Sequence, residues 1–144
     1  MARVYTGGTF DLFHTGHVNL LRRCAELGEV VVALNTDDFI ARFKGHRPVI
    51  SYEDRAAVLR ACRYVADVVP NFGGEDSKPV ILSVAPDVVA IGDDWAPPRD
   101  YCAQMQFTQA WLDGRGIRLV YLPRTPFISS TDIRERMTTA ATAG

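Results

Sequence analysis

Short apolar runs alternate along the chain with stretches of helical periodicity, and this alternation constrains the fold more than any other feature. Five runs have the length of buried strands, and they span residues 4–6, 30–34, 64–69, 88–91 and 117–122. Helical patterns follow Gly16, begin at Ser51 and Pro79, cover residues 103–113 and resume at Ser129. Strands that are separated by helices favour parallel pairing, because a parallel pair needs a crossover connection. The sequence therefore predicts an α/β fold: an open parallel five-stranded sheet with helices on both faces.

The length and composition fit one folded domain. The chain has 144 residues, of which 47% are hydrophobic and 23% charged, and these values exclude intrinsic disorder for most of it. We expect the domain to cover residues 1–137 and the small, polar residues 138–144 to form a flexible tail. No apolar run is long enough for a membrane span and no signal-peptide pattern opens the chain, so we expect a cytoplasmic protein without membrane insertion. The net charge of −1 disfavours nucleic acid as a partner.

The cysteines give no sign of a metal site or of a disulfide framework. There are three, Cys24, Cys62 and Cys102, and none belongs to a CxxC pair. Cys24 and Cys62 fall on apolar positions of helical patterns. We therefore expect a reduced protein with two thiols in its core.

The segment GTFDLFHTGH, at residues 8–17, is the strongest functional signal. It lies between the first predicted strand and the first predicted helix, at the end of the sheet where ligands bind. His14 and His17 are three residues apart at a helix start, so both side chains can face one point. Gly16 lets a ligand approach the backbone, and the amides of the helix N-terminus favour phosphate. The pattern predicts a phosphate site in which two imidazoles donate hydrogen bonds.

A second candidate phosphate site follows the last predicted strand. Arg124 precedes a run of hydroxyl side chains, Ser129, Ser130 and Thr131, that opens the last helix. Such hydroxyls can simply cap the helix. Together with backbone amides and the Arg124 guanidinium, they can also hold the outer phosphates of a nucleotide.

Basic side chains near the same end of the sheet favour an anionic ligand. Lys44, His46 and Arg47 lie in a predicted loop after the second strand, and Lys78 lies at a helix start. Each of these side chains can also be an ordinary solvated surface residue that binds no ligand. Asp11 can occupy an ordinary turn, or it can steer a metal ion or an acceptor hydroxyl.

These motifs resemble those of the cytidylyltransferase-like nucleotidyltransferases, in particular the glycerol-3-phosphate cytidylyltransferases. The resemblance covers nearly the whole chain and implies a Rossmann-like fold. It rests on five segments, which are GTFDLFHTGH at 8–17, SYEDR at 51–55, RYV at 63–65, GDDW at 92–95, and LPRT with ISST at 122–131.

The resemblance implies transfer of CMP from CTP to a phosphorylated small-molecule acceptor, with Mg²⁺ carried by the nucleotide phosphates and a homodimer as the assembly. It implies catalytic roles for His14, His17, Lys44 and Arg124. The residues implied in nucleotide binding are Gly8, Thr9, Phe10, Gly16, His46, Gly92, Asp94, Thr125, Ile128, Ser129, Ser130 and Thr131. Those implied in acceptor binding are Asp11, Lys44, Arg55, Arg63, Lys78 and Trp95. Since no motif holds an obvious covalent nucleophile, we expect direct in-line attack.

Three departures from the family pattern leave the acceptor open. His46 stands where the family has a basic residue, and Pro126-Phe127 replaces a Glu-Gly pair. The segment between Trp95 and Pro123 is longer than in the glycerol-3-phosphate enzymes. We expect its residues 96–114 to govern acceptor choice or dimer contact, with Arg99 and Tyr101 able to reach a bound acceptor.

Two other functions compete with CMP transfer. One is an adenylyltransferase that uses ATP on a sugar phosphate or a flavin. The other is a nucleotide-binding regulator without turnover, which would have no need for both histidines. A dinucleotide-dependent oxidoreductase is set aside, because no GxGxxG pattern follows the first strand.

Overall fold

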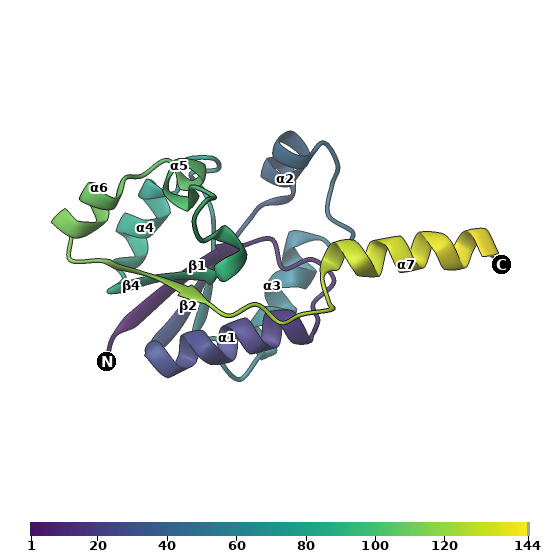
Figure 1. The fold of residues 1–144 in the computed structure, drawn as a ribbon, viewed down its shortest axis with the longest axis horizontal. Coiled ribbons are helices and arrows are strands. Elements are labelled where there is room, and N and C mark those ends of the chain that lie inside the picture. The colour runs from purple at the N-terminus through teal and green to yellow at the C-terminus, as the bar shows by residue number, and fades with distance from the viewer. Residues whose placement is uncertain (144) are drawn as a thin grey trace.

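The computed structural model describes residues 1–143 as an α/β domain around one parallel sheet (Figure 1). The five strands lie in the order β3-β2-β1-β4-β5, and every neighbouring pair is parallel. This confirms the predicted fold class. The strands are β1 (Arg3–Gly8), β2 (Glu29–Leu34), β3 (Asp67–Pro70), β4 (Val88–Gly92) and β5 (Arg118–Leu122).

Helices connect successive strands, as parallel pairing requires. They are α1 (Thr15–Leu27), α2 (Asp37–Lys44), α3 (Tyr52–Ala61), α4 (Lys78–Val84), α5 (Tyr101–Met105), α6 (Gln109–Gly114) and α7 (Ser130–Ala143), with one 3₁₀ turn, η1 (Asp93–Trp95). No helix in the described part of the chain is long and apolar enough to cross a membrane.

Alternation along the strands divides the core into two apolar layers. On one face, Val30 and Val32 of β2 pack with Leu21 and Cys24 of α1 and with residues of α3. On the other face, neighbouring strand residues such as Tyr5 pack with α4, α5 and α6. Strands β2 and β4 are buried along all but one residue each, and β1 is buried at Val4–Thr6. Helices therefore cover both faces, and the open region of the sheet is its carboxyl end.

Helix starts follow the hydroxyl residues that the sequence singles out. The Asp54 amide donates to Ser51 Oγ at the start of α3, and the Asp132 amide donates to Ser129 Oγ at the start of α7. The pivot of the sheet lies between β1 and β4, because the chain leaves β1 first toward β2 and β3 and later toward β4 and β5. In such sheets, ligands bind outside the carboxyl ends of the strands at that point.

Three elements differ from the prediction. Lys44, expected in a loop, is the last residue of α2, because Thr36 caps the start of that helix and Gly45 ends the helix in a left-handed conformation. The helix expected over 103–113 is two short helices, α5 and α6, separated at Gln106, whose φ is 60°.

Helix α7 continues through Ala143 and projects away from the sheet (Figure 1), so residues 138–143 of the predicted tail are helical, and their flexibility stays a prediction. Residues 138–143 contain only Thr and Ala, with no Gly or Pro to end a helix, so the helix has no reason to stop at 137. Gly144, the last residue of that tail, lies outside the described residues.

Candidate active site

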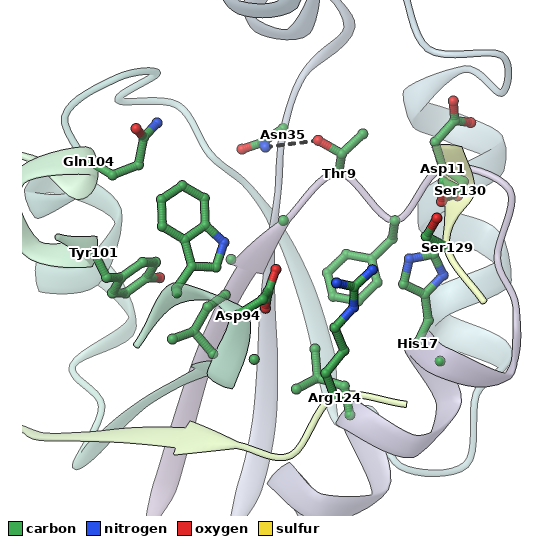
Figure 2. A pocket seen from close by; sticks show the side chains of 18 of the residues that line it. Thr9, Asp11, His17, Asn35, Asp94, Tyr101, Gln104, Arg124, Ser129 and Ser130 are labelled. Carbon is green, nitrogen blue, oxygen red and sulfur yellow. Dashed lines mark hydrogen bonds between the residues drawn. The ribbon is translucent and has the colours of Figure 1, made fainter. Parts of the chain in front are cut away.

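A cavity of about 660 Å³ opens at the carboxyl end of the sheet (Figure 2). Its size is within the usual range for small-molecule sites. Three of the segments that line it come from distant parts of the sequence, which are the loop between β1 and α1, the turn after β4, and the loop between β5 and α7. The two predicted phosphate motifs therefore lie around one cavity.

His14 and His17 form a reciprocal cap at the start of α1. The Gly16 amide donates to His14 Nδ1 over 3.0 Å, and the His14 amide donates to His17 Nδ1 over 3.2 Å. The two rings are nearly stacked, with centroids 3.9 Å apart. Gly16 has to lack a side chain here, because a Cβ would lie 2.7 Å from the His14 ring.

These two hydrogen bonds determine which ring nitrogen carries the proton. A neutral imidazole has one donor and one acceptor nitrogen. Since Nδ1 accepts from a backbone amide in both residues, the proton of each neutral ring is on Nε2. Both side chains line the cavity and present an N–H donor.

The surroundings keep both rings neutral in the free protein. Burial lowers the pKa of His14. The pKa of His17 is lowered to about 3, first by burial and then by the neighbouring His14, whereas Asp11 opposes the change. A nearby negative charge favours the protonated ring, so bound phosphate is expected to raise the pKa of both histidines.

A titration followed by nuclear magnetic resonance checks this assignment. In the free protein, the ¹⁵N shifts of His17 are expected to show an unprotonated Nδ1 and an Nε2–H at neutral pH, with no protonation until the pH falls well below 6.5. Addition of inorganic pyrophosphate is expected to raise the pKa of His17. A His17 that titrates near 6.5 in the free protein, or shows Nδ1–H, would contradict the geometry.

The start of α7 lines the same end of the cavity as the two histidines, and this end is called the phosphate end below. Ser129, Ser130 and Thr131 line the cavity together with Arg134 from the next turn. Ser130 Oγ donates to the carbonyl of Asp11 over 2.5 Å, which joins α7 to the loop that carries the histidines. The amides of this first turn add partial positive charge, so the phosphate end combines two helix N-termini.

Lys44 and Arg124 bring cationic groups to the cavity from α2 and from the loop after β5. Partial burial lowers the pKa of Lys44, and repulsion from Arg134 lowers it further, whereas Asp11 raises it. The Arg124 amide donates to Asp93 Oδ1, which positions the backbone, while its side chain points into the cavity (Figure 2). Both positions agree with the predicted approach to phosphate.

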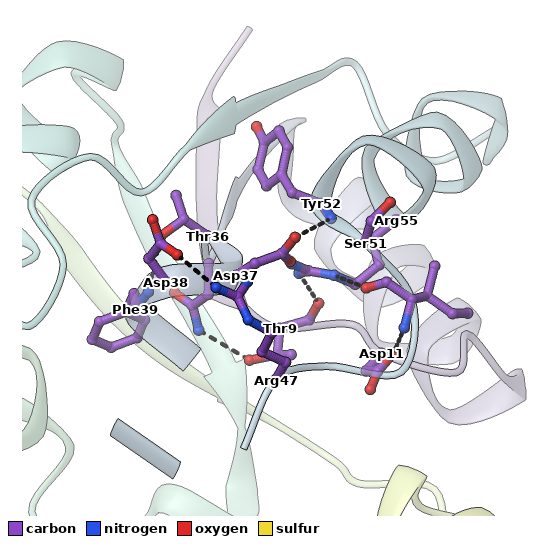
Figure 3. A network of polar contacts seen from close by, with 12 residues as sticks. Thr9, Asp11, Thr36, Asp37, Asp38, Phe39, Arg47, Ser51, Tyr52 and Arg55 are labelled. Carbon is purple, nitrogen blue, oxygen red and sulfur yellow. Dashed lines mark hydrogen bonds and ion pairs between the residues drawn. The ribbon is translucent and has the colours of Figure 1, made fainter. Parts of the chain in front are cut away.

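Asp11 and Arg55 belong to a buried polar network beside the cavity (Figure 3). The amides of Val49 and Ile50 donate to the Asp11 carboxylate over 2.8 and 3.0 Å. Arg55 is 1% exposed, donates to the carbonyls of Thr9 and Ile50, and pairs with Asp37 over 2.7 Å. Every Arg55 nitrogen therefore has a partner within the protein, which differs from the predicted role in acceptor binding. Asp11 lines the cavity, but its carboxylate holds the loop that precedes α3.

The cavity collects most of the predicted site residues and leaves out four. Outside it are His46, which is exposed, Arg63, which follows the C-terminal end of α3, the buried Arg55, and Lys78, which pairs with Asp76 over 2.9 Å. The predicted residues that line it are His14, His17, Lys44, Arg124, Gly8, Thr9, Phe10, Gly16, Gly92, Asp94, Thr125, Ile128, Ser129, Ser130, Thr131, Asp11 and Trp95.

Several lining residues escape prediction from the motifs. Asn35 and Asn71 follow β2 and β3, and they connect by hydrogen bonds to each other and to Thr9. Their place directly after buried strands is the signal that could have identified them. Gln104 of α5 and Arg134 of α7 lie on helices, where no local pattern distinguishes them from surface residues.

An open parallel sheet whose carboxyl end brings together two helix N-termini, two imidazole donors and flanking cations is the arrangement expected of a nucleotidyltransferase. A family model described as cytidylyltransferase-like matches residues 5–136. The chain belongs to this family of nucleotidyltransferases.

Relatives within the family differ in their substrates. The chain is 39% identical over 138 residues to the glycerol-3-phosphate cytidylyltransferase of Bacillus subtilis strain 168, which covers 95% of this chain and 98% of that protein. It is also 39% identical over 140 residues to the FAD synthase of Pyrococcus horikoshii, and this match covers 94% of this chain and 92% of that protein. The crystal structure of the lipopolysaccharide core biosynthesis protein from Thermoplasma volcanium GSS1 superposes with a TM-score of 0.71 at 26% identity, covering 87% of this chain and 98% of that one.

Proposed function

We propose that the protein transfers CMP from CTP to a phosphorylated alcohol, glycerol 3-phosphate or a related polyol phosphate, and releases pyrophosphate. The observation that carries this proposal is that His14 and His17, whose Nδ1 atoms are both occupied by backbone amides, line the same cavity as the first turn of α7. The similarity to the Bacillus subtilis enzyme supports CTP and glycerol 3-phosphate as substrates.

The reaction needs no covalent intermediate with the protein. A phosphate oxygen of the acceptor attacks the α-phosphorus of CTP, and the bond from that phosphorus to the bridging oxygen breaks. The electron pair of that bond leaves with pyrophosphate. Catalysis then comes from positioning and from hydrogen bonds that strengthen as negative charge builds on the phosphates. His14, His17 and the amides of α7 supply donors on the side of the leaving group.

Mg²⁺ fits this site as an ion carried by the nucleotide. Within residues 1–143, no three His, Cys, Asp or Glu side chains gather closely enough to hold a metal ion by themselves. Mg²⁺ in phosphate-transfer sites commonly binds substrate phosphates and keeps several waters. When bound, it would neutralise charge on the triphosphate, while Lys44 and Arg124 approach the phosphates from the protein.

Replacement of Arg124 by lysine tests whether guanidinium geometry matters. The variant keeps the charge and loses the planar pair of donors that matches phosphate oxygens. We expect kcat/KM for CTP to fall by about tenfold, the size of one charge-assisted hydrogen bond. Steady-state kinetics at saturating acceptor gives the value. Activity equal to the wild type would mean that charge alone matters at this position.

Transfer of AMP from ATP to a flavin or a sugar phosphate is the second candidate, and the similarity to the Pyrococcus horikoshii FAD synthase favours it. Pyrophosphate release with CTP and with ATP, each paired with glycerol 3-phosphate and with FMN, separates the two. We expect turnover with CTP and the polyol phosphate. Turnover with ATP alone would support the second candidate, and nucleotide binding without pyrophosphate release would indicate a regulator.

We also propose that the protein acts as a homodimer, as the family resemblance implies. Light scattering on the purified protein tests this. A mass of twice 15.9 kDa is expected, and a mass of one chain would overturn the proposal.

A further inference from the structure

Helix α5 forms one wall of the cavity and is fixed from behind. Ser77, just before α4, donates to the carbonyl of Met105 through both its hydroxyl, over 2.6 Å, and its amide, over 3.2 Å. The Lys78 ammonium donates to the carbonyl of Gln106. Lys78, which was predicted to bind the acceptor, thus uses its ammonium group to hold the end of α5. These contacts hold α5 as a rigid wall, even though five residues are too few for a stable helix alone.

The front of this wall carries hydrogen-bonding groups without partners. Gln104 lines the cavity, and its side chain has no hydrogen-bond partner among the described residues. Tyr101 is 2% exposed and Tyr5, from β1, is fully buried, and neither hydroxyl is hydrogen-bonded. Burial raises the pKa of both tyrosines, so both hydroxyls stay neutral at working pH. A buried hydroxyl without a partner is unfavourable, which points to a ligand or water that completes it.

Side-chain amides continue this neutral surface. Asn71 is 6% exposed, its Nδ2 donates to Asn35 and to the Gly74 carbonyl, and its Oδ1 has no partner. Two acidic side chains line the cavity near this surface: Glu75 pairs with Arg42 over 3.4 Å, and Asp94 lies between this surface and the phosphate end (Figure 2). Gly7 has no side chain beside the Tyr5 hydroxyl, whereas a Cβ at this position would lie 3.1 Å from it.

This neutral surface lies across the cavity from the phosphate end. Figure 2 shows Gln104 and Tyr101 on one side and His17, Ser129 and Ser130 on the other, with Asp94, Thr9 and Asn35 between them. The cavity thus has a cationic, donor-rich end and an opposite end whose unpaired groups are amides and hydroxyls, beside the Trp95 ring on which the Arg99 guanidinium lies. A ligand that fills both ends has phosphate at one end and uncharged hydroxyls at the other.

We propose that α5 makes the acceptor site selective for a phosphorylated alditol chain longer than glycerol 3-phosphate, either free or attached to a ring, with Gln104 and Tyr101 as the residues that bind its far hydroxyls. The inference rests on the proposed nucleotidyl transfer. Arg99, which the sequence predicted to reach the acceptor, has no part in this inference. Its guanidinium lies over the Trp95 ring at 3.7 Å, and Arg99 does not line the cavity.

The test compares three acceptors, which are glycerol 3-phosphate, ribitol 5-phosphate and FMN, with CTP and with ATP. The wild type is expected to prefer one of the two ribityl phosphates over glycerol 3-phosphate by about tenfold in kcat/KM, the size of one added hydrogen bond. Gln104→Leu and Tyr101→Phe should each remove about that factor for the preferred acceptor. For both variants the loss should be larger with the preferred acceptor than with glycerol 3-phosphate, because only the longer chain reaches these side chains.

Gln109→Leu is the matched control, because Gln109 is the same residue type on the neighbouring α6, outside the cavity, and hydrogen-bonded to Asp113. It should change none of these values. A wild type that prefers glycerol 3-phosphate, or variants that weaken all acceptors or the nucleotide alike, would overturn the inference.

Failure of the proposed function has a different outcome. If no nucleotide and acceptor pair releases pyrophosphate, the proposed function is wrong. Calorimetric binding of ribitol 5-phosphate and FMN still decides the inference. Weaker binding to Gln104→Leu than to the wild type and Gln109→Leu supports it, and equal binding contradicts it.

Discussion

Removal of the Nε2–H donor of His14 or His17 is expected to lower kcat by about 10²–10³-fold, the loss measured for one oxyanion-stabilising donor. The variants His14→Ala and His17→Ala should keep most of their affinity for CTP, because the hydrogen bonds matter most as charge develops in the transition state. Single-turnover pyrophosphate release measures the chemical step, and calorimetry measures nucleotide binding.

The reciprocal cap requires a control, since alanine removes a helix cap together with a donor. His14→Asn retains a side-chain acceptor for the Gly16 amide and is a favourable N-cap residue, but it places no donor at the position of Nε2. We expect His14→Asn to match the wild type in thermal stability and His14→Ala in activity. Restored turnover in His14→Asn would mean that the histidine acts only as a cap.

The proximity of these two histidines could be predicted from the sequence, but their chemical state could not. Spacing at a helix start is enough to bring His14 and His17 together. The position of the proton depends on which amide each Nδ1 meets, and that follows from the turn at Gly16. The neutral state of His17 depends on how deeply the ring is buried, which is a property of the assembled site.

Roles that depend on contacts between residues far apart in the sequence were the hardest to predict. Arg55 and Lys78 were predicted as acceptor ligands, because a basic residue near a phosphate motif looks the same whether it meets a substrate or a protein carbonyl. Long-range contacts decide the matter: Arg55 meets Thr9 across 46 residues, and Lys78 meets Gln106 across 28. In contrast, Ser51 and Ser129 were correctly predicted as helix starts, because capping is local.

The wall formed by α5 illustrates the same limit. Residues 101–105 have no strong periodicity, so the break between α5 and α6 could not be placed. The segment was correctly expected to overhang the site, because it follows a strand at the carboxyl end of the sheet. Which of its side chains face the cavity depends on the anchor at Ser77, which lies 28 residues earlier.

Loss of Asp37 is expected to destabilise the protein by about 3–5 kcal/mol, the usual effect of leaving one partner of a buried ion pair alone. The side chain of Arg55 is 0% exposed, so Asp37→Ala leaves its charge buried without a counterion. The same change removes the acceptor for the Tyr52 amide at the start of α3. Chemical denaturation gives the free energy of unfolding.

The double variant Asp37→Ala/Arg55→Met separates the charge from the packing. Methionine fills much of the space of the arginine stem without a charge, so the double variant should be more stable than Asp37→Ala alone. Equal stability of Asp37→Ala and the double variant would show that the unpaired Arg55 charge costs nothing. The carbonyl of Thr9 then has no donor, and Thr9 lines the cavity next to the histidine loop. We therefore expect the double variant to fold but to turn over more slowly than the wild type, because Arg55 supports the site through the backbone that it holds.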